Sequence, residues 1–155
     1  MKKVVLAFSG GLDTSFCVPY LKNEKGLEVH TVLVNTGGFS KEEAARIEER
    51  ALTLGAASHT TVDAVDTYYN KGLKYLIYGN VLKNNTYPLS VSSERVFQAL
   101  EVLNTVKKIG ADYVAHGSTG AGNDQVRFDI VFEIMAPEVE ILAPIRELEI
   151  SRKDE

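Results

Sequence analysis

The sequence predicts an α/β fold, a three-layer sandwich in which helices cover both faces of a mainly parallel, Rossmann-like sheet. Short, continuous apolar runs, which suit strands buried on both faces, alternate along the chain with segments of helical periodicity. Such alternation favours parallel strands joined by right-handed helical crossovers. The chain has 155 residues, 45% of them hydrophobic, which is the size and the core-forming content of one domain.

Three strand–helix units are expected in the first half of the chain. The expected strands are residues 4–8, 29–34 and, with a weaker pattern, 59–62, and a helix follows each of them. The first helix has apolar residues at helical spacing and stops near Gly26. The second opens at Ser40, where Glu43 completes a capping box, and runs to about Leu54. The third helix is expected over residues 65–77.

The second half of the chain is less regular. Residues 78–93 are polar and rich in glycine, asparagine and proline, which predicts a functional loop. A helix over 94–109 and a strand over 111–115 then restore the alternation. A glycine-rich loop at 117–122 leads to residues 125–135, whose β-branched and aromatic content predicts another strand.

The composition argues against several classes of partner. A formal charge of -4 provides no basic field to hold nucleic-acid phosphates, so no nucleic-acid partner is expected. No apolar run approaches the roughly 18 residues of a membrane span, so no membrane partner is expected. Cys17, the only cysteine, cannot form an intrachain disulfide, which fits a cytoplasmic protein. We expect Cys17 to be a small buried hydrophobe rather than a nucleophile.

The end of the sequence carries a helix-opening pattern. Residues 151–154, Ser-Arg-Lys-Asp, place an acid three residues after a potential serine cap, yet the sequence stops at Glu155. This pattern predicts that residues 1–155 are the first part of a longer protein. A frayed acidic tail is the alternative.

The clearest chemical signal is the string Ser-Gly-Gly-Leu-Asp-Thr-Ser at residues 9–15, between the first strand and the first helix. Backbone N–H groups at a helix start suit a phosphate, and glycines let the backbone approach it closely. Asp13 would repel a polyphosphate unless a cation such as Mg²⁺ bridges them, although it could instead cap the helix. The string lacks the Walker A lysine and the dinucleotide glycine spacing. An ordinary strand-to-helix turn is the structural alternative.

The string at residues 9–15 resembles the loop of the ATP-pyrophosphatase (PP-loop) superfamily, which splits ATP between its α- and β-phosphates. Residues 116–129, His-Gly-Ser-Thr-Gly-Ala-Gly-Asn-Asp-Gln-Val-Arg-Phe-Asp, resemble the second signature of the argininosuccinate synthase family. Residues 143–146, Ala-Pro-Ile-Arg, resemble a third, and all three occur in the family's order.

The resemblance implies an adenine nucleotide alpha hydrolase-like fold and an ATP-consuming carbon–nitrogen ligase of arginine biosynthesis. It implies ATP and Mg²⁺ as cofactors and citrulline and aspartate as substrates, joined through a citrullyl-AMP intermediate. Residues 1–155 would be the PP-loop domain, with the C-terminal synthetase domain absent, and the full-length protein would be a homotetramer. The fragment alone is then expected to be inactive.

Three sets of site residues follow from the resemblance. The ATP-binding set is Ala7, Phe8, Ser9, Gly10, Gly11, Leu12, Asp13, Thr14, Ser15, Val34, His116 and Gly117. The citrulline-binding set is Tyr87, Ser92, Asn123 and Arg127, and the aspartate-binding set is Thr119, Asn123 and Asp124. Asp13 is in addition the expected catalytic and metal-positioning residue.

Two rival functions remain open at this point. Another PP-loop enzyme, such as a tRNA thiolase, would be expected to carry catalytic cysteines and a basic RNA face, which this composition lacks. A noncatalytic nucleotide-binding module would bind ATP without catalysing exchange between ATP and pyrophosphate.

Among the histidines, His30 and His59 are expected to be structural, whereas His116, just before the glycine loop, fits a site role as well as a structural one.

Overall fold

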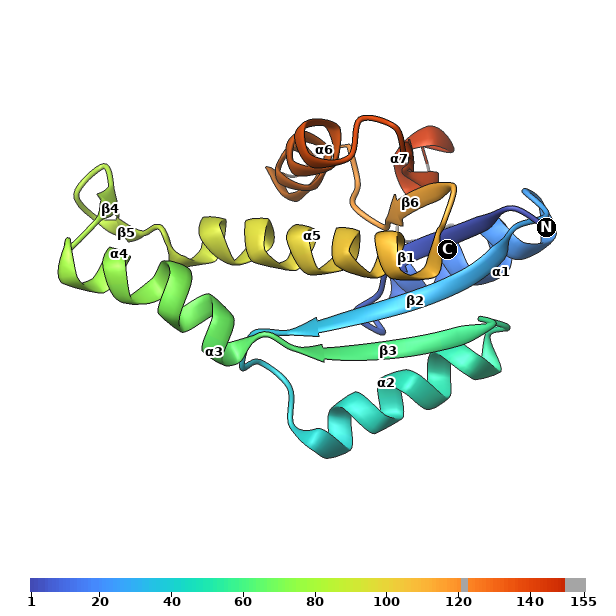
Figure 1. Cartoon of the computed structure of the whole chain (residues 1–155), viewed down its shortest axis with the longest axis horizontal. Coiled ribbons are helices and arrows are strands. Elements are labelled where there is room, and N and C mark those ends of the chain that lie inside the picture. The colour runs from blue at the N-terminus through green and yellow to red at the C-terminus, as the bar shows by residue number, and fades with distance from the viewer. Residues whose placement is uncertain (121–122, 150–155) are drawn as a thin grey trace.

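Five parallel strands form the central sheet in the order β3-β2-β1-β6-β7 (Figure 1). The computed structural model describes residues 1–120 and 123–149. The strands are β1 Lys3–Ala7, β2 Glu28–Asn35, β3 Ser58–Asp63, β6 Tyr113–His116 and β7 Glu140–Leu142. β1 lies at the centre and pairs with β2 on one side and β6 on the other, so the strand order reverses direction there. The expected parallel sheet is confirmed.

Helices connect the strands. They are α1 Leu12–Asn23, α2 Lys41–Thr53, α3 Val65–Tyr68, the π-helical turn η1 Tyr69–Leu73, α4 Lys74–Tyr78, α5 Ser90–Ile109, α6 Asn123–Met135 and α7 Pro144–Glu147. The capping box of α2 is present: the Ser40 hydroxyl accepts from the Glu43 N–H, and the Glu43 carboxylate accepts from the Ser40 N–H. None of the helices in the described residues has both the length and the apolar character that crossing a bilayer requires.

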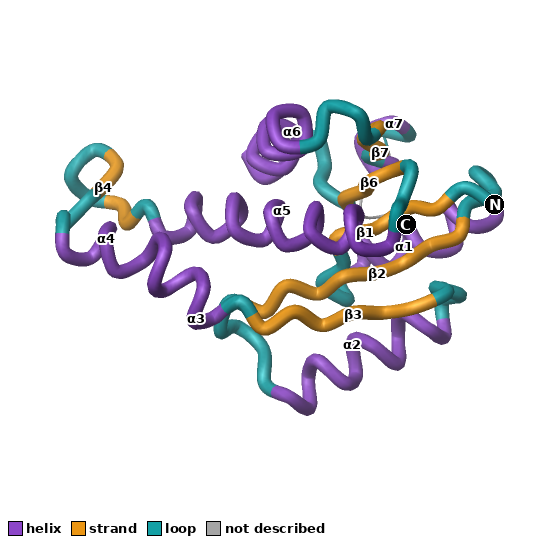
Figure 2. The backbone as a smooth tube through the Cα atoms, viewed as in Figure 1, coloured by secondary structure: helices purple, strands orange, loops and turns teal. Residues whose placement is uncertain are grey.

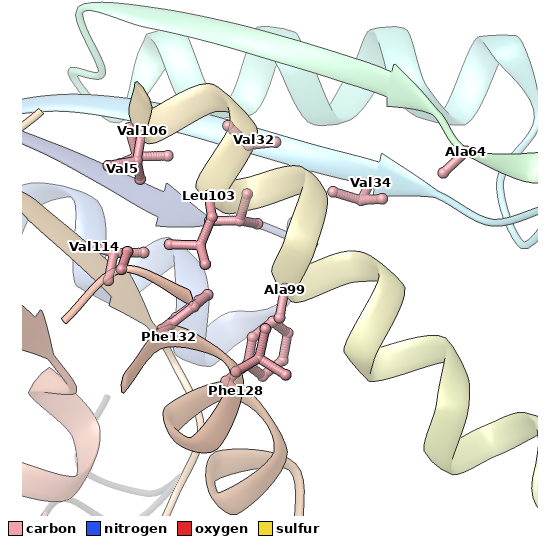
Figure 3. Packing of buried hydrophobic residues seen from close by; sticks show 13 residues of the cluster. Val5, Val32, Val34, Ala64, Ala99, Leu103, Val106, Val114, Phe128 and Phe132 are labelled. Carbon is pink, nitrogen blue, oxygen red and sulfur yellow. The ribbon is translucent and has the colours of Figure 1, made fainter. Parts of the chain in front are cut away.

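Two hydrophobic clusters flank the sheet and make it the middle of three layers. Val5 and other strand residues pack against α5 and α6 on one face, where Phe128 and Phe132 point from α6 toward α5 (Figure 3). Val4 and Leu6, the neighbours of Val5, face the opposite way and pack with residues of α1, α2 and α7. Strand residues that alternate between two apolar layers explain why the strands read as continuous apolar runs.

The strand expected over residues 125–135 is wrong, because this segment is the helix α6. Phe128, Val131 and Phe132 are buried, whereas Ile130 and Ile134 are exposed, which is a helical and not an alternating pattern. The β-branched and aromatic content that suggested a strand instead supplies bulky side chains to the core cluster. Burial against α5 and the sheet therefore outweighs the weak β preference of these residues.

Residues 78–93 contain more structure than the expected loop. A small hairpin, β4 Leu82–Lys83 and β5 Tyr87–Pro88, lies apart from the main sheet (Figure 2), and α5 begins at Ser90 rather than at Glu94. The helix expected over 65–77 is present as the consecutive segments α3, η1 and α4, with the π-helical turn η1 in the middle. β7 and α7 were not expected. The helix-opening pattern at residues 151–154 lies outside the described residues.

Candidate functional site

A cleft of ≈ 990 Å³ opens at the carboxyl ends of β1, β2 and β6. This edge is where parallel α/β sheets bind ligands, next to the strand at which the order reverses. The N-terminal end of α5 extends beyond the arrowheads of β2 and β3 in Figure 1, and this part of the helix forms one wall of the cleft. The expected site residues that line the cleft are Ala7, Phe8, Ser9, Gly11, Leu12, Asp13, Thr14, Val34, His116, Gly117, Thr119, Asn123, Asp124 and Arg127.

The glycine loop connects the end of β1 to the start of α1. Gly10 has φ +74, and a Cβ there would lie 2.9 Å from Cγ1 of Ile47, so both the backbone and the packing require glycine. The Thr14 hydroxyl donates to the Gly11 carbonyl at 3.3 Å. The Ser15 hydroxyl is buried and has no hydrogen-bond partner within the described residues. The loop thus places backbone N–H groups and hydroxyls at the positive end of a helix dipole.

A second glycine joins this loop to the one that follows β6. A Cβ on Gly117 would lie 3.0 Å from Cγ2 and 3.2 Å from N of Thr14, and 3.3 Å from C of Asp13. Gly117 therefore permits the backbone of the β6 loop to contact the first turn of α1. The two motifs recognised separately in the sequence form one floor of the cleft.

His116 is buried at the end of β6 and holds the β6 loop in place. Its Nδ1 accepts from the Ser118 N–H at 3.2 Å, so the ring proton is on Nε2, which donates to Asp129 at 2.8 Å. Arg146, from the third sequence motif, donates to the other oxygen of the same carboxylate. Burial raises the pKa of Asp129, but the hydrogen bonds from His116 and Arg146 lower it more. The pKa of the carboxyl group is therefore below its usual value. His116 thus combines a cleft-lining position with a structural role.

A network of charged side chains from α5 and α6 also lines the cleft. Arg127 donates to Oδ1 of Asp124 at 2.7 Å and to the Ser92 hydroxyl at 3.0 Å. Arg95, on α5, donates to Oδ2 of Asp124 at 3.2 Å. An α-amino acid carries an ammonium next to a carboxylate, and the adjacent Asp124 and Arg127 present the complementary charges.

Four of the expected residues do not line the cleft. Gly10 and Ser15 belong to the glycine loop, but Gly10 is buried against Ile47 and the Ser15 hydroxyl is buried in α1. Ser92 is connected to the cleft through its hydrogen bond from Arg127. Tyr87 is 49% exposed on β5, in the hairpin beyond the N-terminal end of α5.

Sequence reasoning missed three polar residues of the α5 wall. Glu94, Arg95 and Gln98 line the cleft and are joined by hydrogen bonds, and Glu94 also accepts from the Thr36 hydroxyl. Gln98 lies four residues after Glu94 and three after Arg95, which places both of them beside Gln98 on a helix, and this spacing was the available signal. The pattern could not reveal that this side faces the strand ends.

The remaining cysteine and histidine expectations concern residues outside the cleft lining. Cys17 is buried in α1, as expected. His30 contacts Ser58 and Glu28 through its two ring nitrogens. Burial lowers the pKa of His59, whose ring contacts the Thr31 hydroxyl. These contacts fit the structural roles expected for both histidines.

The donor set at the glycine loop fits a metal ion that arrives with a nucleotide. Asp13 lies in the first turn of α1 and lines the cleft. Within residues 1–120 and 123–149, no group of three or more His, Cys, Asp or Glu side chains could hold a metal ion. Mg²⁺ is commonly bound by one or two carboxylates together with substrate phosphates, so a single aspartate at a phosphate loop is a suitable partner.

Solved structures with low sequence identity share this fold. A protein from Methanocaldococcus jannaschii described as a predicted subunit of tRNA methyltransferase has a TM-score of 0.59 at 21% identity, over 99% of this chain and 72% of that chain. The NH3-dependent NAD synthetase of Campylobacter jejuni has a TM-score of 0.56 at 16% identity, over 76% of this chain and 47% of that chain. These likenesses support the Rossmann-like α/β fold.

Sequence comparison identifies the family. The chain is 48% identical over 148 residues to the argininosuccinate synthase of Xylella fastidiosa, covering 96% of this chain and 36% of the relative. It is 45% identical over 153 residues to that of Saccharolobus solfataricus, covering 99% and 39%. The chain thus spans well under half the length of these curated relatives. A model of the arginosuccinate synthase N-terminal HUP domain matches residues 3–155. The chain therefore belongs to the argininosuccinate synthase family and corresponds to its N-terminal HUP domain.

Proposed function

We propose that this chain is the ATP-binding part of an enzyme that joins citrulline and aspartate to form argininosuccinate. The observation that carries the proposal is one cleft that combines a phosphate-type loop with the Asp124–Arg127 pair, which complements an amino-acid zwitterion. The ureido oxygen of citrulline would attack the α-phosphate of ATP, forming citrullyl-AMP and releasing pyrophosphate. The amine of aspartate would then displace AMP. No covalent enzyme nucleophile is needed.

The glycine loop is the proposed phosphate site. Backbone N–H groups at the start of α1 would donate to phosphate oxygens, and the hydroxyls of Ser9 and Thr14, which line the cleft, offer further donors. Asp13 would hold a Mg²⁺ ion that binds with the nucleotide. This ion would neutralise charge on the leaving pyrophosphate. The base and ribose would lie toward Val34 at the end of β2, which lines the same cleft. Catalysis would depend on alignment and charge stabilisation.

The α5 and α6 wall is the proposed amino-acid site. Arg127 is suited to a carboxylate because its guanidinium donates in a forked geometry. Asp124 can accept from an ammonium, and Asn123 can both donate and accept. Thr119, Ser92 and Tyr87 complete the proposed citrulline and aspartate contacts. Asp124 pairs with both Arg127 and Arg95, so a substrate zwitterion would replace the Arg127–Asp124 pair by one ion pair with each of these two side chains.

Calorimetry on the 155-residue chain tests the nucleotide site. ATP should bind, and Asp13→Ala should weaken the binding of Mg-ATP more than that of metal-free ATP. Asp66→Ala is the matched control, because Asp66 is an exposed acid in the first turn of α3, outside the cleft. Equal losses for the two nucleotide forms would remove the metal role of Asp13. Absence of ATP binding would remove the proposed nucleotide site.

Isotope exchange in the complete protein tests the chemistry. Citrulline should stimulate exchange between ATP and pyrophosphate, and aspartate should then yield argininosuccinate and AMP. The 155-residue chain should form no measurable argininosuccinate, because closure by further residues would align the reactants and exclude water. ATP binding by the complete protein without any exchange would instead favour a noncatalytic nucleotide-binding module. We also propose that the complete protein is cytoplasmic and forms a homotetramer, and sedimentation of the purified protein can check the oligomeric state.

A further inference from the structure

Helix α2 contacts the glycine loop through residues that lie outside the cleft. Nη1 of Arg50 donates to the carbonyl oxygen of Gly10 at 2.6 Å, a contact that spans 40 positions of sequence. Ile47, three residues earlier on α2, packs where a Cβ of Gly10 would lie. Neither Arg50 nor Ile47 lines the cleft, and both line a smaller hollow of ≈ 230 Å³ beside it. One face of α2 therefore holds Gly10 by a hydrogen bond and by van der Waals contact.

The contact with Gly10 also fixes the N–H of the next residue. The described residues contain no cis peptide bond, and in a trans peptide the C=O and the following N–H point in opposite directions. The carbonyl of Gly10 points toward Arg50 on α2, so the N–H of Gly11 points away from α2. Gly11 lines the cleft, and among the described residues its N–H makes one long contact, 3.5 Å from the Ser9 hydroxyl.

We propose that Arg50 is a positioning residue of the phosphate loop. It holds the Gly10–Gly11 peptide so that the Gly11 N–H faces the phosphates of bound ATP. A charge-assisted hydrogen bond to the carbonyl also polarises the peptide, which strengthens the N–H as a donor on the other side. The inference rests on the proposed ATP site and adds to it a residue outside the cleft. Arg50 itself touches no phosphate in this arrangement.

Binding of ATP and of adenosine to the 155-residue chain separates this role from general destabilisation. Arg50→Gln should raise the Kd for ATP roughly five- to tenfold, since it loses a hydrogen bond from a charged donor. It should leave the Kd for adenosine unchanged, because adenosine has no phosphates. Arg50→Lys, which keeps the charge and a hydrogen-bond donor group, should recover part of the ATP affinity. Arg46→Gln, one turn earlier on α2, is the control for the change in charge.

The amide signal of Gly11 gives a second measurement that does not depend on affinity. In the wild-type chain, titration with ATP should shift this nuclear magnetic resonance signal strongly, and in Arg50→Gln the shift should be smaller. Equal losses of ATP and adenosine affinity, or an ATP affinity equal to that of Arg46→Gln, would overturn the role of Arg50 while leaving the ATP site in place. A wild-type chain that binds adenosine and ATP equally would overturn the phosphate site itself, and the role of Arg50 with it.

Discussion

Replacing Phe132 with alanine should destabilise the domain by about 3 to 5 kcal/mol, the usual range for a fully buried phenylalanine. Phe132 is 0% exposed and packs against the rings of His116 and Phe128, with centroids 6.4 and 5.7 Å away. Ile134, two residues on, is 70% exposed. Ile134→Ala should change the free energy of unfolding by less than about 0.5 kcal/mol, because little apolar area returns to water.

The comparison works because helix and strand place these two residues differently. Residues two apart lie on the same face of a strand but on nearly opposite sides of a helix. Thermal unfolding followed by circular dichroism measures the difference. For a domain of this size each 1 kcal/mol shifts Tm by about 2 to 4 °C, so Phe132→Ala should lower Tm by roughly 6 to 20 °C.

Similar losses of stability for Phe132→Ala and Ile134→Ala would refute the helical assignment of α6. The site would be affected as well, because Asp124 and Arg127 are three residues apart. On a helix they lie on one face and pair at 2.7 Å, whereas on a strand they would point to opposite faces. The charge pair that we propose for amino-acid recognition therefore requires α6 to be a helix.

Two further predictions concern the floor of the cleft. Gly117→Ala should weaken ATP binding roughly tenfold, because its Cβ would press on the backbone of Thr14; an unchanged Kd in calorimetry would show that the loops can separate without loss. Asp129→Asn should destabilise the chain by about 1 to 3 kcal/mol at neutral pH, because the charge-assisted hydrogen bonds with His116 and Arg146 are weakened. The pKa of Asp129 lies below its ordinary value of 3.8, so this stabilisation should be complete above that pH and should disappear as pH falls through the lower, folded-state pKa. Denaturant titrations of both proteins between pH 7 and pH 2 would contradict this if the difference between them stayed constant.

Several features could be predicted from short stretches of sequence because local interactions determine them. The capping box of α2 needs only Ser40 and Glu43, and the positive φ at Gly10 is a local reason for glycine there. The strands β1, β2 and β6 were recognisable because both of their faces are buried, which leaves an uninterrupted apolar run. The position of the glycine loop between a strand and a helix followed from the apolar run that precedes it and from the glycines themselves.

Other features depended on contacts between segments that are far apart in the sequence. The composition of α6 alone favours a strand, and packing of Phe128 and Phe132 against α5 and the sheet makes it a helix. The α5 wall could not be assigned to the cleft from sequence. Helical spacing shows which residues share a face of the helix, but it does not show which part of the protein that face lies against.

The sequence by itself determined the alternation of elements, the glycine loop and the family signatures, since each depends on residues close together in the chain. Only the tertiary structure decided which side chains meet. Asp129 joins His116 to Arg146, and Arg50 reaches Gly10 across 40 positions. Such pairs carry no local signal, because their geometry exists only after the sheet and both helical layers have packed together.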